Sequence, residues 1–129
     1  MKKLIFTLLF STVMFSSPSF AKWTNVGKNV DGNTFYVDFD RIRKHDGYVY
    51  YWTLFDYLKP TKTGTLSGKN YQQVDCQLFR VKDLSVSFHK KPMGGGTGDD
   101  YQLREEDKKW IYPSPESVNE FMLKKVCSH

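Results

Sequence analysis

Residues 22–112 consist of short runs rich in Tyr, Trp, Phe, Val and Thr, separated by clusters of Gly, Asp, Asn and Pro. Runs of β-branched and aromatic residues bounded by turn formers are typical of strands. The pattern therefore predicts a mostly β domain. Strands are expected over Lys22–Val30, Thr34–Phe39, Tyr48–Leu58, Tyr71–Phe79 and Val81–Phe88, with a last one around Trp110–Tyr112.

Turn-forming residues connect these strands at short intervals. Asp31-Gly32-Asn33 predicts a hairpin between the first two strands. Asp40 is placed to cap one helical turn over Arg41–Lys44. Further turns or loops are expected at Asp46-Gly47, at Lys59–Gly68 and in the glycine-rich stretch Pro92–Asp100.

The longest expected strand, Tyr48–Leu58, carries apolar side chains on both faces. A strand of this kind lies inside a sheet, with each face at least partly covered. We expect it to be the central strand. One face holds Tyr48, Tyr50, Trp52 and Leu54, and the other holds Val49, Tyr51, Thr53, Phe55 and Tyr57.

Near the C-terminus the pattern changes from strand to helical spacing. Helix-start signals occur at Ser114-Pro115 and, one turn later, as a capping box over Ser117–Glu120, so the start stays open between them. We expect the helix to loosen just before Cys127, because regular winding would point that sulfur away from the apolar face. That face consists of Val118, Phe121, Met122 and Val126.

The first residues form a secretory signal pattern. Lys2 and Lys3 precede the apolar run Leu4–Phe15, and Ser19-Phe20-Ala21 predicts cleavage after Ala21. The apolar run is too short for the roughly twenty residues of a membrane-spanning helix, and no second candidate span follows. We expect residues 1–21 to be a cleavable signal peptide and residues 22–129 to be a single exported domain.

Composition limits the classes of partner. The whole chain has a net charge of +5, and removing Lys2 and Lys3 leaves +3. A charge this small is not the basic footprint of a nucleic-acid-binding protein.

Both cysteines, Cys76 and Cys127, follow the signal, and an even count in an exported chain predicts one disulfide, which would tether the helix. No lipobox cysteine follows the signal to carry a lipid anchor.

Residues that could support catalysis or hold a cofactor form no recognisable motif. His45, His89 and His129 lack a metal-binding spacing, so neither a metal nor a cofactor is expected. The glycines of 94–98 lack the residues of a phosphate loop and predict either a tight, mobile turn or a close backbone approach. Asp56 lies among apolar residues, so it should find an arginine, Arg80 or Arg104, or a backbone partner. We expect a protein that is not an enzyme.

One small basic cluster is a candidate contact region. His89, Lys90 and Lys91, with Lys82 nearby in the sequence, lead into the glycine-rich loop. The cluster could bind an acidic partner protein, a glycosaminoglycan or anionic lipid head groups. The alternative is a solvated strand edge whose charges discourage aggregation, with His89 a plain surface residue.

The order and spacing of landmarks along the chain resemble those of the surface-adhesin protein E family of Gram-negative bacteria. The resemblance extends over essentially all of residues 22–129. It is carried by Trp23-x-x-Val26-Gly27, Tyr36-Val37-Asp38, Ile42-Arg43, Trp52-Thr53-Leu54-x-Asp56-Tyr57-x-x-Pro60, Ser67 before Tyr71, Asp75-Cys76 with Arg80, Met93-Gly94-x-Gly96, Trp110, Pro113-x-Pro115 and Cys127.

This resemblance implies an α+β fold: an antiparallel sheet of about six strands and a C-terminal helix tethered by a Cys76–Cys127 disulfide. It also implies display on the cell surface and attachment to host matrix or serum proteins such as vitronectin and laminin. The leading hypothesis is an exported, non-enzymatic binding protein with His89, Lys90 and Lys91 as its contact region. The alternative is a periplasmic ligand-binding or envelope-maintenance protein.

Overall fold

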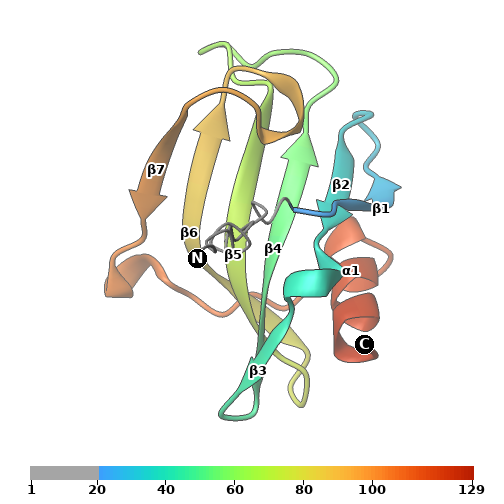
Figure 1. Ribbon diagram of the computed structural model, residues 1–129. Coiled ribbons are helices and arrows are strands. Elements are labelled where there is room, and N and C mark those ends of the chain that lie inside the picture. Colours follow the sequence, from blue (N-terminus) through green and yellow to red (C-terminus); the bar gives the residue numbers. More distant parts are fainter. Residues whose placement is uncertain (1–20) are drawn as a thin grey trace, which may run out of the picture.

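The computed structural model describes residues 21–129, and the predicted signal segment lies outside the described residues apart from Ala21. Seven strands form one antiparallel sheet in the order β1-β2-β4-β5-β6-β7, with β3 also paired to β4 (Figure 1). One helix, α1, follows. The elements are β1 (Thr24–Lys28), β2 (Thr34–Val37), β3 (Arg43–His45), β4 (Tyr48–Asp56), β5 (Ser67–Asp75), β6 (Arg80–His89), β7 (Gly98–Gln102) and α1 (Val118–Cys127).

The predicted α+β class, the first hairpin and the central position of the longest strand are confirmed. β1 pairs with β2 across the Asp31–Asn33 turn. β4 lies between β2 and β5 and also pairs with β3, so its backbone is hydrogen-bonded along both edges.

The helical turn predicted over Arg41–Lys44 is wrong. A single 3-10 turn spans Phe39–Arg41, and its cap is Asp38, which accepts a hydrogen bond from the backbone N–H of Asp40. The chain then forms β3, because the turn at Asp46 and Gly47 returns it directly alongside β4. Strand pairing across this turn replaces the helical hydrogen bonds.

The strand predicted around Trp110–Tyr112 is reduced to one bridge, in which Ile111 and Val81 exchange two backbone hydrogen bonds of 2.8 and 2.9 Å. The edge strand is instead β7, which begins inside the predicted glycine-rich loop. Four of its five residues are exposed. An exposed edge strand needs no apolar alternation, so this segment carried little strand signal.

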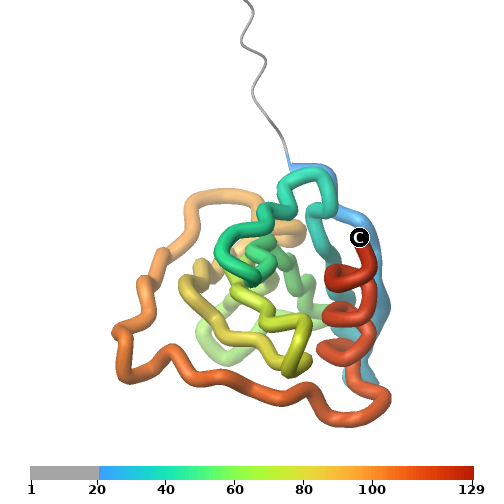
Figure 2. Tube along the Cα trace, turned by 90° about the horizontal axis from the view of Figure 1, so that it is seen from below, coloured from blue at the N-terminus to red at the C-terminus, as the bar shows by residue number. Residues whose placement is uncertain are grey.

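The core lies on one face of the sheet, called the helix face here, and α1 covers it. Figure 2 shows α1 against the N-terminal strands, with the segment after β7 running across one side of the molecule to reach it. Apolar side chains from five strands meet the helix there. The cluster comprises Val26, Val37, Val49, Tyr51, Val74, Val81, Met122, Leu123 and Val126.

The helix begins at the second of the two predicted start signals. The Ser117 hydroxyl accepts a hydrogen bond from the backbone N–H of Glu120, as an N-cap does. The expected loosening before Cys127 is wrong. Leu123 is fully buried and Phe121 is 44 % exposed, so the buried face is rotated from the predicted one. Cys127 follows Leu123 by one helical turn and therefore faces the sheet without unwinding.

The predicted disulfide is present. Cys76, in the turn after β5, is bonded to Cys127 at the end of α1, with their Cα atoms 5.7 Å apart. The bond ties the last turn of the helix to the sheet. Within residues 21–129, no helix is both long and apolar enough to cross a membrane.

Candidate functional site

The structure does not bring the predicted basic cluster together as one patch. His89, expected at the surface, is only 5 % exposed. Its Nε2 lies 2.9 Å from the hydroxyl of Ser87, and the backbone of Gly98 covers its ring. The prediction that His89 is a surface residue is therefore wrong. The sequence placed His89 at the end of a strand, but β7 covers its side chain.

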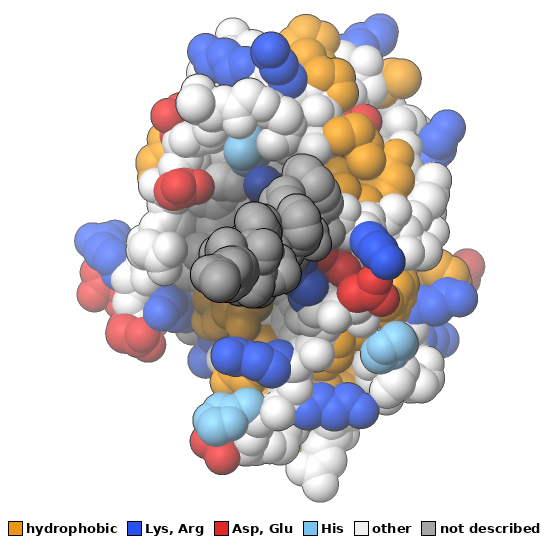
Figure 3. Space-filling view, in the orientation of Figure 1, with side chains coloured by type: hydrophobic (Ala, Val, Ile, Leu, Met, Phe, Trp, Pro, Cys, Tyr) orange, Lys and Arg blue, Asp and Glu red, His pale blue; other side chains and the backbone are white. Residues whose placement is uncertain are grey.

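Lys90 and Lys91 are both exposed, but their side chains have different neighbours. Lys90 lines a hollow together with Phe88. The side chain of Lys91 lies beside Gly95 and Gly96 instead. Lys82, at the other end of β6, has its ammonium nitrogen 4.3 Å from the ring centroid of Trp110. Figure 3 shows Lys and Arg side chains spread over the visible face and interleaved with acidic ones.

A hollow, called the threonine hollow here, lies on the helix face at the end of the sheet that the helix leaves uncovered. Its volume is about 440 Å³. Residues of three segments line it: the β4–β5 loop, the end of β6, and β7. They are Tyr57, Thr61, Thr63, Thr65, Phe88, Lys90, Asp99 and Tyr101.

The β4–β5 loop forms one wall of the threonine hollow and is fixed by backbone hydrogen bonds. The N–H of Tyr57 donates to the carbonyl of Leu66, and the N–H of Leu66 donates to the carbonyl of His89. Within the loop, the hydroxyls of Thr61 and Thr63 are 3.2 Å apart, and those of Thr63 and Thr65 are 3.4 Å apart. Alternation of three threonines therefore gives a row of hydroxyl groups along the wall.

Aromatic side chains form the floor. Phe88 lies 5.8 Å from Tyr101 and 6.4 Å from Phe55, measured between ring centroids, and Phe55 lies 5.4 Å from Tyr57. Gly68 makes this arrangement possible, since a side chain at that position would overlap the Phe55 ring. Tyr101 is 53 % exposed, so its ring remains open to a ligand.

The glycine-rich loop is held to the sheet by three polar contacts. The Ser67 hydroxyl donates to the carbonyl of Lys91 and accepts from the N–H of Gly94, at 2.6 and 2.8 Å. The N–H of Met93 donates to Asp56 at 2.8 Å, so the expected partner of Asp56 is backbone rather than arginine. Both interpretations of the glycines apply: Pro92–Gly94 forms a tight 3-10 turn with Gly94 and Gly96 at positive φ, and Gly98 closely approaches the ring of His89.

The other face of the sheet carries a row of stacked aromatic side chains that the sequence pattern did not indicate. Tyr71 lies 4.9 Å from Trp52 and 6.2 Å from Tyr50, and Tyr48 lies 5.8 Å from Trp110, between ring centroids. Because these side chains stack on one another across the strands, they account for much of the aromatic content as sheet packing.

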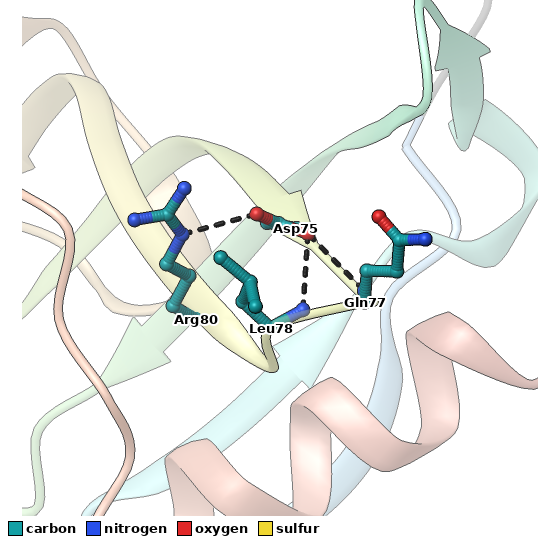
Figure 4. Close-up of polar contacts among 4 residues, drawn as sticks. All are labelled: Asp75, Gln77, Leu78 and Arg80. Atoms are coloured by element: carbon teal, nitrogen blue, oxygen red, sulfur yellow. Dashed lines mark hydrogen bonds and ion pairs between the residues drawn. The ribbon is translucent and has the colours of Figure 1, made fainter.

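Asp75 organises the turn that positions Cys76 (Figure 4). Its carboxylate accepts hydrogen bonds from the backbone N–H groups of Gln77 and Leu78 and pairs with Arg80 at 3.0 Å. The bond from Leu78 holds the pKa of Asp75 below its ordinary value; partial burial opposes this shift, and Arg80 reinforces it. This cluster is structural, since every contact supports the turn.

Buried polar side chains on the helix face offer no metal site. Burial raises the pKa of the Tyr51 hydroxyl, and the charge of nearby Asp83 adds to the effect. Gln72 donates to Asp83 at 2.7 Å. Within residues 21–129, no three His, Cys, Asp or Glu side chains are grouped so that they could hold a metal ion.

Comparison with solved structures shows the same fold in Haemophilus influenzae protein E. Crystal form II of that protein aligns with a TM-score of 0.61 at 16% identity, covering 90% of this chain and 96% of that one. A second protein E structure aligns with a TM-score of 0.60 at 15% identity, covering 88% of this chain and 91% of that one. Protein E from non-typeable Haemophilus influenzae aligns with a TM-score of 0.57 at 14% identity, covering 90% of this chain and 83% of that one.

Sequence comparison is consistent with this likeness in fold. No curated protein matches the chain by sequence. The profile of the family described as surface-adhesin protein E matches residues 23–128, which is nearly all of the described chain. The chain therefore belongs to the surface-adhesin protein E family.

Proposed function

We propose that this protein is an exported, non-enzymatic adhesin that attaches to host matrix or serum proteins such as vitronectin and laminin. The observation that supports this most is the family match over residues 23–128. The cleavage pattern ending at Ala21 supports export.

The proposed contact region is the end of the sheet where Lys90 and Lys91 emerge. Both side chains are exposed, Lys90 at the threonine hollow and Lys91 beside Gly95 and Gly96, so a partner covering this end of the sheet would meet both charges. His89 is buried beneath Gly98 and would act only by supporting this end. Exposed lysines attract acidic partners, and salt screens that attraction.

Charge reversal tests the contact region. The double variant Lys90→Glu, Lys91→Glu should bind immobilised vitronectin and laminin several-fold more weakly at low salt, and its binding should depend less on salt. The matched control is Lys124→Glu, Lys125→Glu, which changes the same charge in the last turn of α1. Unchanged binding of the first variant, or an equal loss in both, would rule out the assignment.

Protease shaving of intact cells tests the location that adhesion requires. Cleavage of the protein, while a periplasmic marker survives, would support exposure to the host. Protection until the outer membrane is opened would remove the basis for adhesion. That outcome would favour the alternative, a periplasmic ligand-binding or envelope-maintenance protein.

A further inference from the structure

We propose that the threonine hollow binds a neutral sugar ring of a glycan. This inference deepens the proposed function, since it names the chemical group on a host glycoprotein that one end of the sheet would recognise. It rests on the aromatic floor, the hydroxyl wall and the charge balance of the hollow.

The aromatic floor suits the apolar face of a sugar. A pyranose ring presents carbon-bound hydrogens on its faces and hydroxyls around its edge. Tyr101 is exposed at 53 % and lies 5.8 Å from Phe88, so the two rings offer a surface with one side free. Aromatic rings of this kind provide contact area at low cost in conformational entropy.

The wall and rim suit the hydroxyl edge of the sugar. The exposed hydroxyls of Thr61 and Thr63 can each donate and accept, as sugar hydroxyls do, while the hydroxyl of Thr65, which is only 9 % exposed, lies 3.4 Å from that of Thr63 and supports it. The rim adds one acceptor-only group, the carboxylate of Asp99, and one donor-only group, the ammonium of Lys90. Adjacent hydroxyls on a ring need both kinds of partner at once.

The charge balance argues for a neutral ligand. Asp99 and Lys90 are the two charged residues among those that line the hollow, and their charges cancel. A sulfated or carboxylated sugar would be attracted by Lys90 and repelled by Asp99, so it would gain little from the site. The volume of about 440 Å³ lies in the range of small-ligand pockets.

The hollow is accessible and is built on a fixed frame. Tyr101 and Asp99 belong to the edge strand β7, whose pairing with β6 sets their positions. The loop wall is anchored through the bond from Leu66 to His89. A ligand would therefore meet a largely preformed surface, which limits the ordering cost of binding.

Saturation-transfer NMR on the exported, disulfide-bonded protein tests the proposal, with lactose as the neutral probe and glucuronic acid as the charged comparison. Lactose should receive saturation through its ring hydrogens, and its binding should not depend on salt. Tyr101→Ala should weaken binding about tenfold, in keeping with loss of one aromatic contact. Tyr101→Phe should retain most of it.

Two further variants make the test specific. Asp99→Asn, which keeps size but removes the charge, should weaken lactose binding several-fold. Tyr112 lies outside the hollow and is 61 % exposed, so Tyr112→Ala should leave lactose binding unchanged. Absence of lactose binding, or binding unaffected by Tyr101→Ala, would overturn the proposal, as would a preference for glucuronic acid.

Enzymatic removal of glycans from vitronectin and laminin separates this proposal from the proposed function. Loss of binding to the deglycosylated proteins, matched by loss with Tyr101→Ala, would support the sugar site. Full binding to the deglycosylated proteins would overturn the sugar site and leave host attachment standing. Lactose binding without attachment to either host protein would support the sugar site and contradict the proposed function.

Discussion

Gly98 lies so close to the ring of His89 that no side chain fits between them. A Cβ atom on Gly98 would lie 2.7 Å from Nε2 and 2.8 Å from Nδ1 of the imidazole. The ring is thus enclosed by β7 on one side and held by Ser87 through Nε2. This contact positions the edge strand that carries Asp99 and Tyr101.

Gly98→Ala should destabilise the protein by about 1–3 kcal/mol, as is usual when a methyl group is forced into a filled space. Thermal unfolding would measure this as a lower Tm. Thr97→Ala, at the exposed neighbouring position, is the control and should have little effect. In a His89→Ala background, most of the penalty of Gly98→Ala should disappear, since the overlapping ring is gone. An equal penalty in both backgrounds would contradict the contact.

Asp75→Asn should lower stability at neutral pH, and the difference from the unmodified protein should shrink in acid. The pKa of Asp75 lies below its ordinary value of 3.8, chiefly because the N–H of Leu78 bonds its carboxylate, and Arg80 reinforces this effect. A lowered pKa means that the contribution is fully present above the ordinary value and is lost as the pH falls through the folded value. Melting curves at neutral pH and at about pH 3 would measure the difference. A stability difference between the two proteins that grows in acid would contradict the stabilising role of the Asp75 carboxylate.

Replacing both Cys76 and Cys127 with alanine should cost roughly 4 kcal/mol, from the entropy of closing a long loop. Their sequence separation is 51 residues. For a domain of this size, the loss corresponds to a Tm lower by roughly 15 °C. Adding a reductant should reproduce the loss in the unmodified protein and change nothing in the variant. Equal melting of both proteins under oxidising conditions would show that the bond contributes little.

Leu123→Ala should destabilise by about 2–5 kcal/mol, because it leaves a cavity under the helix. Leu123 is fully buried and Phe121 is 44 % exposed. Phe121→Ala is therefore the comparison and should cost much less, although it removes the larger side chain. Chemical denaturation of both variants would reveal which face of α1 packs on the sheet. The reverse order would favour the face predicted from sequence spacing.

Much of the fold could be predicted from local patterns. The hairpin at Asp31–Asn33 and the C-terminal helix depend on turn and cap chemistry within a few residues, although the sequence left the helix start open between Ser114 and Ser117. The failures involve partners distant in sequence. β3 exists because β4 lies beside it, and β7 exists because β6 offers an edge. Neither segment has an apolar pattern of its own.

The candidate site was predicted less well for the same reason. Lys90 could be identified because it follows a strand and precedes a loop. The burial of His89 depends on Gly98, and the threonine hollow depends on the β4–β5 loop and β7 meeting across β6. The alternation of Thr61, Thr63 and Thr65 could have predicted a row of hydroxyl groups on one side of the loop. Nothing in the neighbouring sequence indicated which residues that row would face.

The contact between α1 and β1 brings the two ends of the described chain together. Val26, near the start, shares a cluster with Met122, Leu123 and Val126, near the end. During synthesis, the sheet would therefore expose its apolar face until the last turn of the helix has emerged. Contacts between residues so far apart in the sequence slow folding, because the entropy of closing the intervening chain is lost before the contacts stabilise the fold. A chain still attached to the ribosome would therefore stay incompletely folded until it is released.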